Sequence, residues 1–269
     1  MAGKTENWVS VANDINMLAA YLGIRDVLEL TQGALQSRYG FKQADVMALF
    51  GGSILAGGDV LAEAMHADVA RAYVIVGGAG HTTEMLRAKT RSLCPDLEFA
   101  NDATESEIFS AYLLRTYGLT PNLLEMHSTN CGNNITNLRD LLNEQGIKHD
   151  SLILSQDATM QRRMVAGVLK EMPSTTPIAF ATYEAHMIVQ EGEGLIYEHA
   201  PRGMWEPRRY LTLLMGEIPR LTDDDDGYGP KGRGFIVHLD VPDQVKESWE
   251  RLRKRYPWSV RRADPRYAG

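Results

Sequence analysis

Two glycine-rich segments of the sequence have the residue types that could hold a small ligand. Each follows an apolar run, and the second continues into a helical pattern. Glycine lets a ligand approach the backbone closely, and the first N–H groups of a helix favour an anion or a carboxylate. The same glycines could equally serve only to make tight turns between strand and helix. On the first interpretation we expect ligand contacts from Gly51, Gly52, Ser53, Gly77, Gly78, Gly80, His81 and Thr82.

Polar residues that follow two further apolar runs form the other half of the expected site. Ser, Thr and Asn are all good N-caps, and three of them precede a single predicted helix, so two are free for a ligand. The helix after the fourth apolar run carries arginines, and a guanidinium suits a carboxylate or a phosphate. We therefore expect further ligand contacts from Ser128, Thr129, Asn130, Asn134, Gln156 and Arg163.

Three residues are candidates for catalysis. Glu105 begins a predicted helix near the glycine turns, where it could hydrogen-bond a ribose, bind a metal or act on a phosphate substrate. Asp157 could act in the same way, or could simply cap the helix that follows it. Cys131 lies near a helix N-terminus, which can lower a thiol pKa, and His127 could serve as its base. For Cys131 we favour the plainer interpretation, a small residue packed under the loop.

The elements that must position these residues alternate along the chain. Five apolar runs, near residues 44–53, 71–78, 122–128, 150–155 and 177–184, read as strands. Their continuous apolar character indicates a sheet covered on both faces, and the helices between them indicate parallel strands. We therefore predict an α/β protein with a Rossmann-like doubly wound parallel sheet, in which ligands bind at the carboxyl ends of the strands.

The domain organisation follows from where this alternation starts and stops. We expect a Rossmann-like α/β domain over residues 40–190. Residues 1–39 and 191–269 should form a smaller helical subdomain that packs beside it. Within the second segment we expect a short strand at 235–242.

Composition narrows the class of protein. The 269 residues carry a net charge of −7, which argues against a nucleic-acid partner. Two cysteines without metal-ligand spacing indicate neither a disulfide framework nor a structural metal. With no signal-like segment and no apolar run of membrane-spanning length, we expect a cytoplasmic protein. The oligomeric state is left open.

An acidic run, Asp223–Asp226, precedes a glycine-rich segment in the C-terminal part of the chain. Four consecutive aspartates cannot all face one ion, so we interpret the run as a solvated loop. The following segment could fold over the ligand cleft. There Tyr228, Lys231 and Arg233 would be its candidate contacts.

These stretches together resemble a known bacterial family. ADVMALFGGS, VIVGGAGHTTEML, HSTNCGNN and SQDATMQRR are similar to successive motifs of the YdcF/SanA/ElyC family. The segment RYLTLLMGEIPRLTDDDDGYGPKGRGFIVHLDVP resembles the C-terminal part of the YdcF branch. The resemblance implies a Rossmann-like domain that binds S-adenosylmethionine, without an established reaction. SanA-like relatives act in the cell envelope and carry a membrane anchor.

Two departures from the family pattern shape the expected function. The wider family often has Glu where this chain has Asn133, and the SanA-like branch has His where this chain has Thr159. Both changes remove groups for acid–base or metal chemistry. We therefore expect a protein that binds a small nucleotide-type ligand, S-adenosylmethionine first among them, and leave open whether it is an enzyme. The alternative is a hydrolase or transferase acting on phosphate or glycan-phosphate substrates of envelope metabolism.

Overall fold

The computed structural model describes residues 8–52, 54–80 and 82–260, and a parallel sheet forms its centre. Five strands lie in the order β3-β2-β1-β4-β5, and every neighbouring pair is parallel. Their bounds are β1 Ala44–Phe50, β2 Ala70–Val76, β3 Leu123–Glu125, β4 Ser151–Ser155 and β5 Thr176–Ala179. The predicted Rossmann-like doubly wound α/β fold is confirmed.

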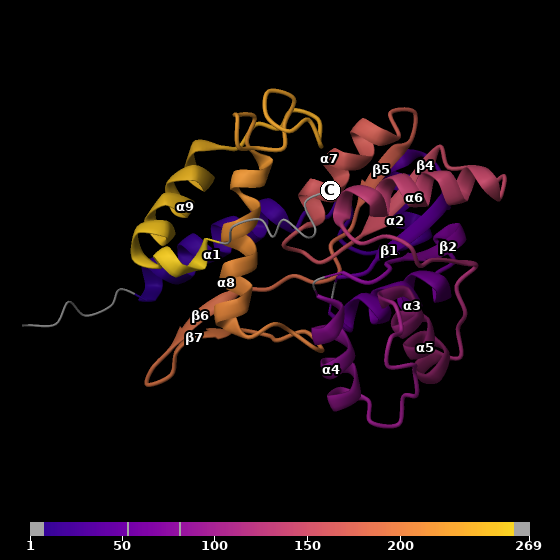
Figure 1. The fold of residues 1–269 in the computed structure, drawn as a ribbon, viewed down its shortest axis with the longest axis horizontal. Helices are drawn as coiled ribbons and strands as arrows, with labels where there is room; N and C mark the ends of the chain where they lie inside the picture. The colour runs from indigo at the N-terminus through magenta and orange to yellow at the C-terminus, as the bar shows by residue number, and fades with distance from the viewer. Residues whose placement is uncertain (1–7, 53, 81, 261–269) are drawn as a thin grey trace, which may run out of the picture.

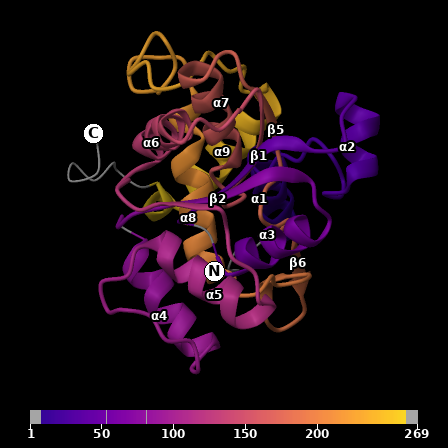
Figure 2. The ribbon, with the colours of Figure 1, turned by 90° about the vertical axis from the view of Figure 1, so that its right-hand side faces the viewer.

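Both faces of the sheet are covered by helices, which explains its continuous apolar strands. Alternate residues of β1 enter two different cores: Met47 and Leu49 pack on one face, and Val46, Ala48 and Phe50 on the other. The first core includes α3 (Ala56–His66) and α5 (Glu105–Tyr117), and the second includes α6 (Cys131–Glu144) and α7 (Gln161–Glu171). Figure 2 shows α6 and α7 on one side of the strands and α3 and α5 on the other.

The strand ends meet at one edge of the sheet. In the register, Phe50 pairs with Val76 and Leu49 pairs with Ser155, so β1, β2 and β4 end side by side. The strand order reverses between β1 and β4, because the chain runs from β1 outward to β3 before it returns to β4. A crevice at such a reversal is where ligands bind in this class of sheet.

A second lobe packs beside the sheet, and we call it the C-terminal lobe although α1 (Trp8–Leu22) belongs to it. Its other elements are the hairpin of β6 (Met187–Gln190) and β7 (Gly194–Tyr197), then α8 (Pro207–Glu217) and α9 (Asp243–Arg255). Two short 3-10 helices, Pro219–Leu221 and Pro257–Ser259, complete it. Figure 1 shows these elements on one side and the sheet on the other. One apolar core joins α1, α8 and α9.

Three features of the fold differ from the sequence expectation. The β6–β7 hairpin was not predicted, and no strand forms at 235–242, where the prediction was wrong. The helix α2 (Gln32–Tyr39) packs on the sheet rather than with α1. Its Leu35 is fully buried in the same core as Met47.

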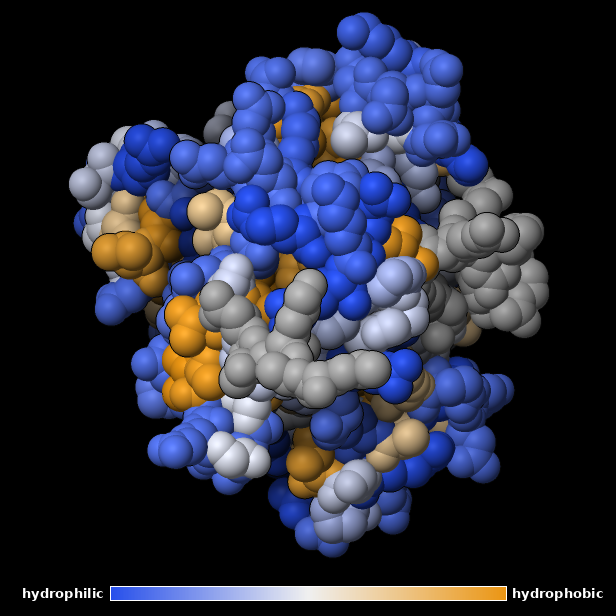
Figure 3. Space-filling view, turned by 90° about the vertical axis from the view of Figure 1, so that its left-hand side faces the viewer, coloured by the Kyte–Doolittle hydropathy of each residue, from blue (hydrophilic) through white to orange (hydrophobic). Residues whose placement is uncertain are grey.

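The surface of the C-terminal lobe is mostly polar. In Figure 3 the face that this lobe presents is largely hydrophilic, with apolar side chains in separate spots. Within the described ranges, no helix combines the length and the apolar character needed to cross a membrane.

Candidate functional site

Glu105 occupies the space that the two glycine turns leave open. A Cβ atom at Gly51 would lie 2.4 Å from Oε2 of Glu105, and one at Gly77 would lie 3.0 Å from its Cβ. The hydroxyls of Thr82 and Thr83 donate to Oε1 of Glu105 at 3.0 and 2.9 Å. The close approach that these glycines allow is therefore made by a buried carboxyl group of the protein. Burial raises the pKa of Glu105, although the two hydroxyls oppose this.

The second glycine turn also caps a helix of the protein. The carbonyls of Gly78 and Gly77 accept from the N–H groups of Glu105 and Ser106, at 3.0 and 2.9 Å, which are the first two of α5. The N–H of Gly78 donates to Oγ of Ser128 at 3.1 Å, and that of Gly80 to Oγ1 of Thr83 at 2.7 Å. These peptide groups are thus engaged within the protein, as a turn-making role requires.

The polar run before α6 forms a capping box. Oδ1 of Asn130 accepts from the N–H groups of Gly132 and Asn133 at 2.9 and 3.0 Å. Oδ1 of Asn133 accepts in return from the N–H groups of Asn130 and Thr129. Asn133 therefore stands at the position where a capping box usually has Glu or Gln. The side-chain amide of Asn134 makes no hydrogen bond within the described residues, so it is the group of this run left for a ligand.

Gln156 joins the ends of β1 and β4. Its Nε2 donates to the carbonyl of Gly51 at 3.1 Å, and its Oε1 accepts from the N–H of Asp157 at 2.6 Å. Its own N–H donates to Gln161 at 2.8 Å. Gln156 is fully buried. It therefore fixes the two strand ends that border the crevice.

Asp157 connects the sheet edge to the C-terminal lobe. Its carboxylate accepts from Tyr183 and from Trp205 Nε1, each at 2.9 Å, and from the hydroxyl and the N–H of Thr159 at 2.6 and 3.0 Å. Burial raises the pKa of Asp157, and these four donors oppose the rise. The side chain is fully buried. The contacts favour an anchoring role for Asp157 over catalysis.

Cys131 and Arg163 meet on the other side of the crevice. Nη2 of Arg163 lies 3.5 Å from Sγ of Cys131, and the guanidinium bonds both carboxylate oxygens of Glu217 in α8 at 2.5 and 3.1 Å. His127 is exposed and is not among the described contacts of Cys131. A cavity of about 170 Å³ lies here, bordered by Asn130, Cys131 and Arg163 and by Tyr228 and Arg233 of the glycine-rich loop. That loop thus folds onto α6 and α7.

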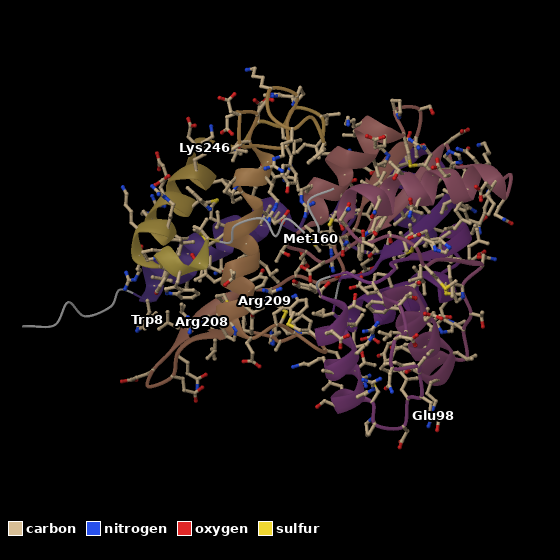
Figure 4. The ribbon with its side chains drawn as sticks, viewed as in Figure 1. Trp8, Glu98, Met160, Arg208, Arg209 and Lys246 are labelled. Atoms are coloured by element: carbon tan, nitrogen blue, oxygen red, sulfur yellow. The ribbon has the colours of Figure 1, made fainter. Side chains whose placement is uncertain are left out.

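Met160 lies between the Gly52 turn and Cys131. A Cβ atom at Gly52, whose φ is +78°, would lie 3.6 Å from Cε of Met160, and the Met160 sulfur lies 3.7 Å from that of Cys131. Figure 4 shows Met160 between the sheet and the C-terminal lobe. The half-buried Trp205 of the C-terminal lobe bonds Asp157 at 2.9 Å, and the guanidinium of the half-buried Arg209 lies 6.0 Å over its indole ring. Sequence reasoning missed both residues, because no motif marks them.

Hydrogen bonds to the acidic run stabilise the glycine-rich loop. Asp223 accepts from the N–H of Lys231 at 2.7 Å, and Asp224 accepts from the N–H of Gly227 at 2.9 Å. The ring of His238 lies between two carboxylates, with Nδ1 2.7 Å from Asp223 and Nε2 3.1 Å from Asp240. Because the loop carries Tyr228 and Arg233, these contacts hold one wall of the cavity.

His238 should titrate above its ordinary pKa of 6.5, because hydrogen bonds to Asp223 and then Asp240 favour the protonated ring. A raised folded-state pKa means that the pair contributes its full stabilisation below the unfolded value and loses it as pH rises through the folded value. We expect an NMR titration of the ring to show this rise and to show a lower pKa in Asp223→Asn. Asp226→Asn is the matched control, because Asp226 is not among the described partners of His238. An unchanged pKa in Asp223→Asn would contradict the assignment.

Two residues of the predicted site, Ser53 and His81, lie outside the described residues. The structure brings the other predicted residues to one edge of the sheet, but it engages most of them with one another. No protein-family model matches the chain.

Proposed function

We propose that this chain binds a small nucleotide-type ligand at the carboxyl edge of its sheet, with S-adenosylmethionine as the first candidate. One observation carries the proposal. Trp205, which bonds Asp157 and carries Arg209 over its ring, brings the C-terminal lobe to the strand ends, where Met160 lies against the Gly52 turn near the reversal of strand order. Crevices at this point are the ligand sites of doubly wound sheets.

The chemistry of these side chains suits such a ligand. An indole and a thioether offer apolar surface to a flat base, and guanidinium groups recognise carboxylates and phosphates. The amide of Asn134 and the cavity beside Cys131 and Arg163 add polar contacts nearby. The resemblance of the sequence motifs to the YdcF branch singles out S-adenosylmethionine within this class.

The hydrogen bonds that already occupy the carboxyl groups of Glu105 and Asp157 favour binding over hydrolysis. Oε1 of Glu105 already accepts two hydroxyl hydrogen bonds, and Asp157 accepts four hydrogen bonds from protein donors. A general acid or base must reach the substrate, directly or through one water. Carboxyl groups engaged in this way are better suited to holding the walls of the crevice.

The neighbouring arginines of α8 give a matched test. Arg209 lies over Trp205, whereas Arg208 lies over Trp258, 4.4 Å from its ring centre, and Figure 4 shows the two on different sides of the helix. In calorimetric titration with S-adenosylmethionine, we expect Arg209→Ala to weaken binding about ten-fold or more, as loss of a charge-assisted hydrogen bond does. Arg208→Ala should bind like the parent chain.

Three outcomes separate the possibilities. No heat and no thermal shift at millimolar S-adenosylmethionine would exclude this ligand, and the same titration with ATP then tests the wider nucleotide class. Equal weakening by both arginine variants would place the site elsewhere. Binding that is lost only in Arg209→Ala supports the proposal.

A further inference from the structure

A second cavity, of about 350 Å³, lies between α1 and the chain that leads into and out of the β6–β7 hairpin. Part of its wall is made of small residues, Ala19 and Ala20 of α1, the following Gly23, and Ala158 and Ala185. The rings of Tyr183 and Tyr210 also line it. None of these residues is among those that we assign to the nucleotide site, so the inference goes beyond the proposed function.

The hydroxyl of Tyr210 is the unexplained group in this cavity. Tyr210 is 1% exposed, yet its hydroxyl has no hydrogen-bond partner in the part of the chain that the structure describes. The neighbouring tyrosines differ, because Tyr183 donates to Asp157 at 2.9 Å and Tyr197 donates to the carbonyl of Trp205 at 3.0 Å. Because Tyr210 lines the cavity, its unpaired hydroxyl is available to a ligand that enters it.

The charged groups at the cavity indicate the charge of that ligand. Glu184 and Glu198 line it, and no lysine or arginine is among the described lining residues. Glu184 is paired with Arg25 at 3.3 Å, which leaves Glu198, 3.1 Å from His186, as the carboxylate that can take a cation. The amide of Asn16 is fully used by the backbone of Met187. The faces of tyrosine rings also attract cations.

We propose that this cavity binds a small organic amine, with its short apolar body against the alanines and its ammonium group between Tyr210 and Glu198. The phenol oxygen of Tyr210 accepts one ammonium N–H, and Glu198 balances the charge. A carboxylate of the same shape would meet the carboxylates of Glu184 and Glu198, with only the imidazoles of His186 and His199 as basic groups among the described lining residues.

Three probes of one shape test the charge preference. Phenethylamine, 2-phenylethanol and 3-phenylpropionate differ mainly in their polar end, and ligand-detected NMR measures the affinity of each for the full chain. We expect binding in the order amine, alcohol, carboxylate. Tyr210→Phe should weaken the amine about five-fold, the usual effect of one lost hydrogen bond.

Two further variants keep the test decisive. Ala20 is exposed at the mouth of the cavity, so Ala20→Leu should block binding without disturbing the core. Glu198→Gln should remove the preference for the amine over the alcohol. Glu193→Gln, an exposed change in the turn of the same hairpin, should leave it intact. Equal affinity for the three probes, or undiminished binding in Ala20→Leu, would overturn the proposal.

Discussion

Replacing Glu217 by alanine is expected to lower the free energy of unfolding by about 3–5 kcal/mol, because the guanidinium of Arg163 then stays buried without its carboxylate. The two side chains are 12% and 6% exposed, so solvent screens their interaction little. Arg163 lies in α7 and Glu217 in α8, so the pair joins the sheet to the C-terminal lobe. Urea unfolding of the full chain measures the loss.

The control for this prediction is an exposed ion pair of the same lobe. Glu250 bonds Arg253 at 2.8 Å, but both side chains are more than 40% exposed, and Glu250→Ala should cost less than about 1 kcal/mol. The double variant Arg163→Met with Glu217→Leu should recover most of the loss, because apolar groups of similar volume replace buried ion pairs well. A similar loss in Glu217→Ala and Glu250→Ala would show that Arg163 is not buried as described.

The fold could be predicted because local patterns fix it. Continuous apolar runs such as residues 44–50 leave no polar face, so only a sheet covered on both sides accommodates them. The alternation of these runs with amphipathic helices then requires parallel strands. The hairpin β6–β7 escaped prediction because its strands are only four residues each and are mostly not buried. Its register depends on packing against α1, which lies more than 150 residues away.

The site could be predicted only in part. Sequence placed the glycine turns and the polar helix starts at one edge, since parallel strands end together. It could not show that Glu105 fills the glycine turns, because the contacts join Glu105 to Gly51 and Gly77, which are distant in the sequence. Nor could it find Trp205 and Arg209, whose place depends on how the C-terminal lobe docks through Asp157.

The capping box of α6 shows how one residue can mislead. Asn133 looks like a lost acid when it is compared with the Glu of related motifs. In the structure its side chain accepts from the N–H groups of Asn130 and Thr129, which is the capping function that a Glu at this position would also serve. The difference between Asn and Glu therefore leaves the start of the helix intact, whatever it does to chemistry in the crevice.

The second large effect concerns Gly51, and it separates the two interpretations of the glycine turns. A methyl group at Gly51 would lie 2.4 Å from Oε2 of Glu105, inside a fully packed region, so Gly51→Ala should destabilise the chain by about 3 kcal/mol. Gly33→Ala is the matched control, because a Cβ there meets no atom closer than 3.9 Å. It lies within α2 and should stabilise the chain by about 0.5–1 kcal/mol.

A double-mutant cycle with Glu105 tests the cause. Glu105→Gly removes both the carboxyl and the Cβ atom that the new methyl group would strike, at 2.4 and 2.7 Å, so Gly51→Ala should cost little in that background, and the coupling should exceed about 1 kcal/mol. If Gly51 were kept open for a ligand instead, Gly51→Ala would spare stability, weaken ligand binding and show no coupling to Glu105. Urea unfolding of the four chains, read beside ligand titration, distinguishes the two. Coupling in stability would mean that the glycine turn exists to seat Glu105, and that the ligand contacts this wall through Gly52 and Met160 instead.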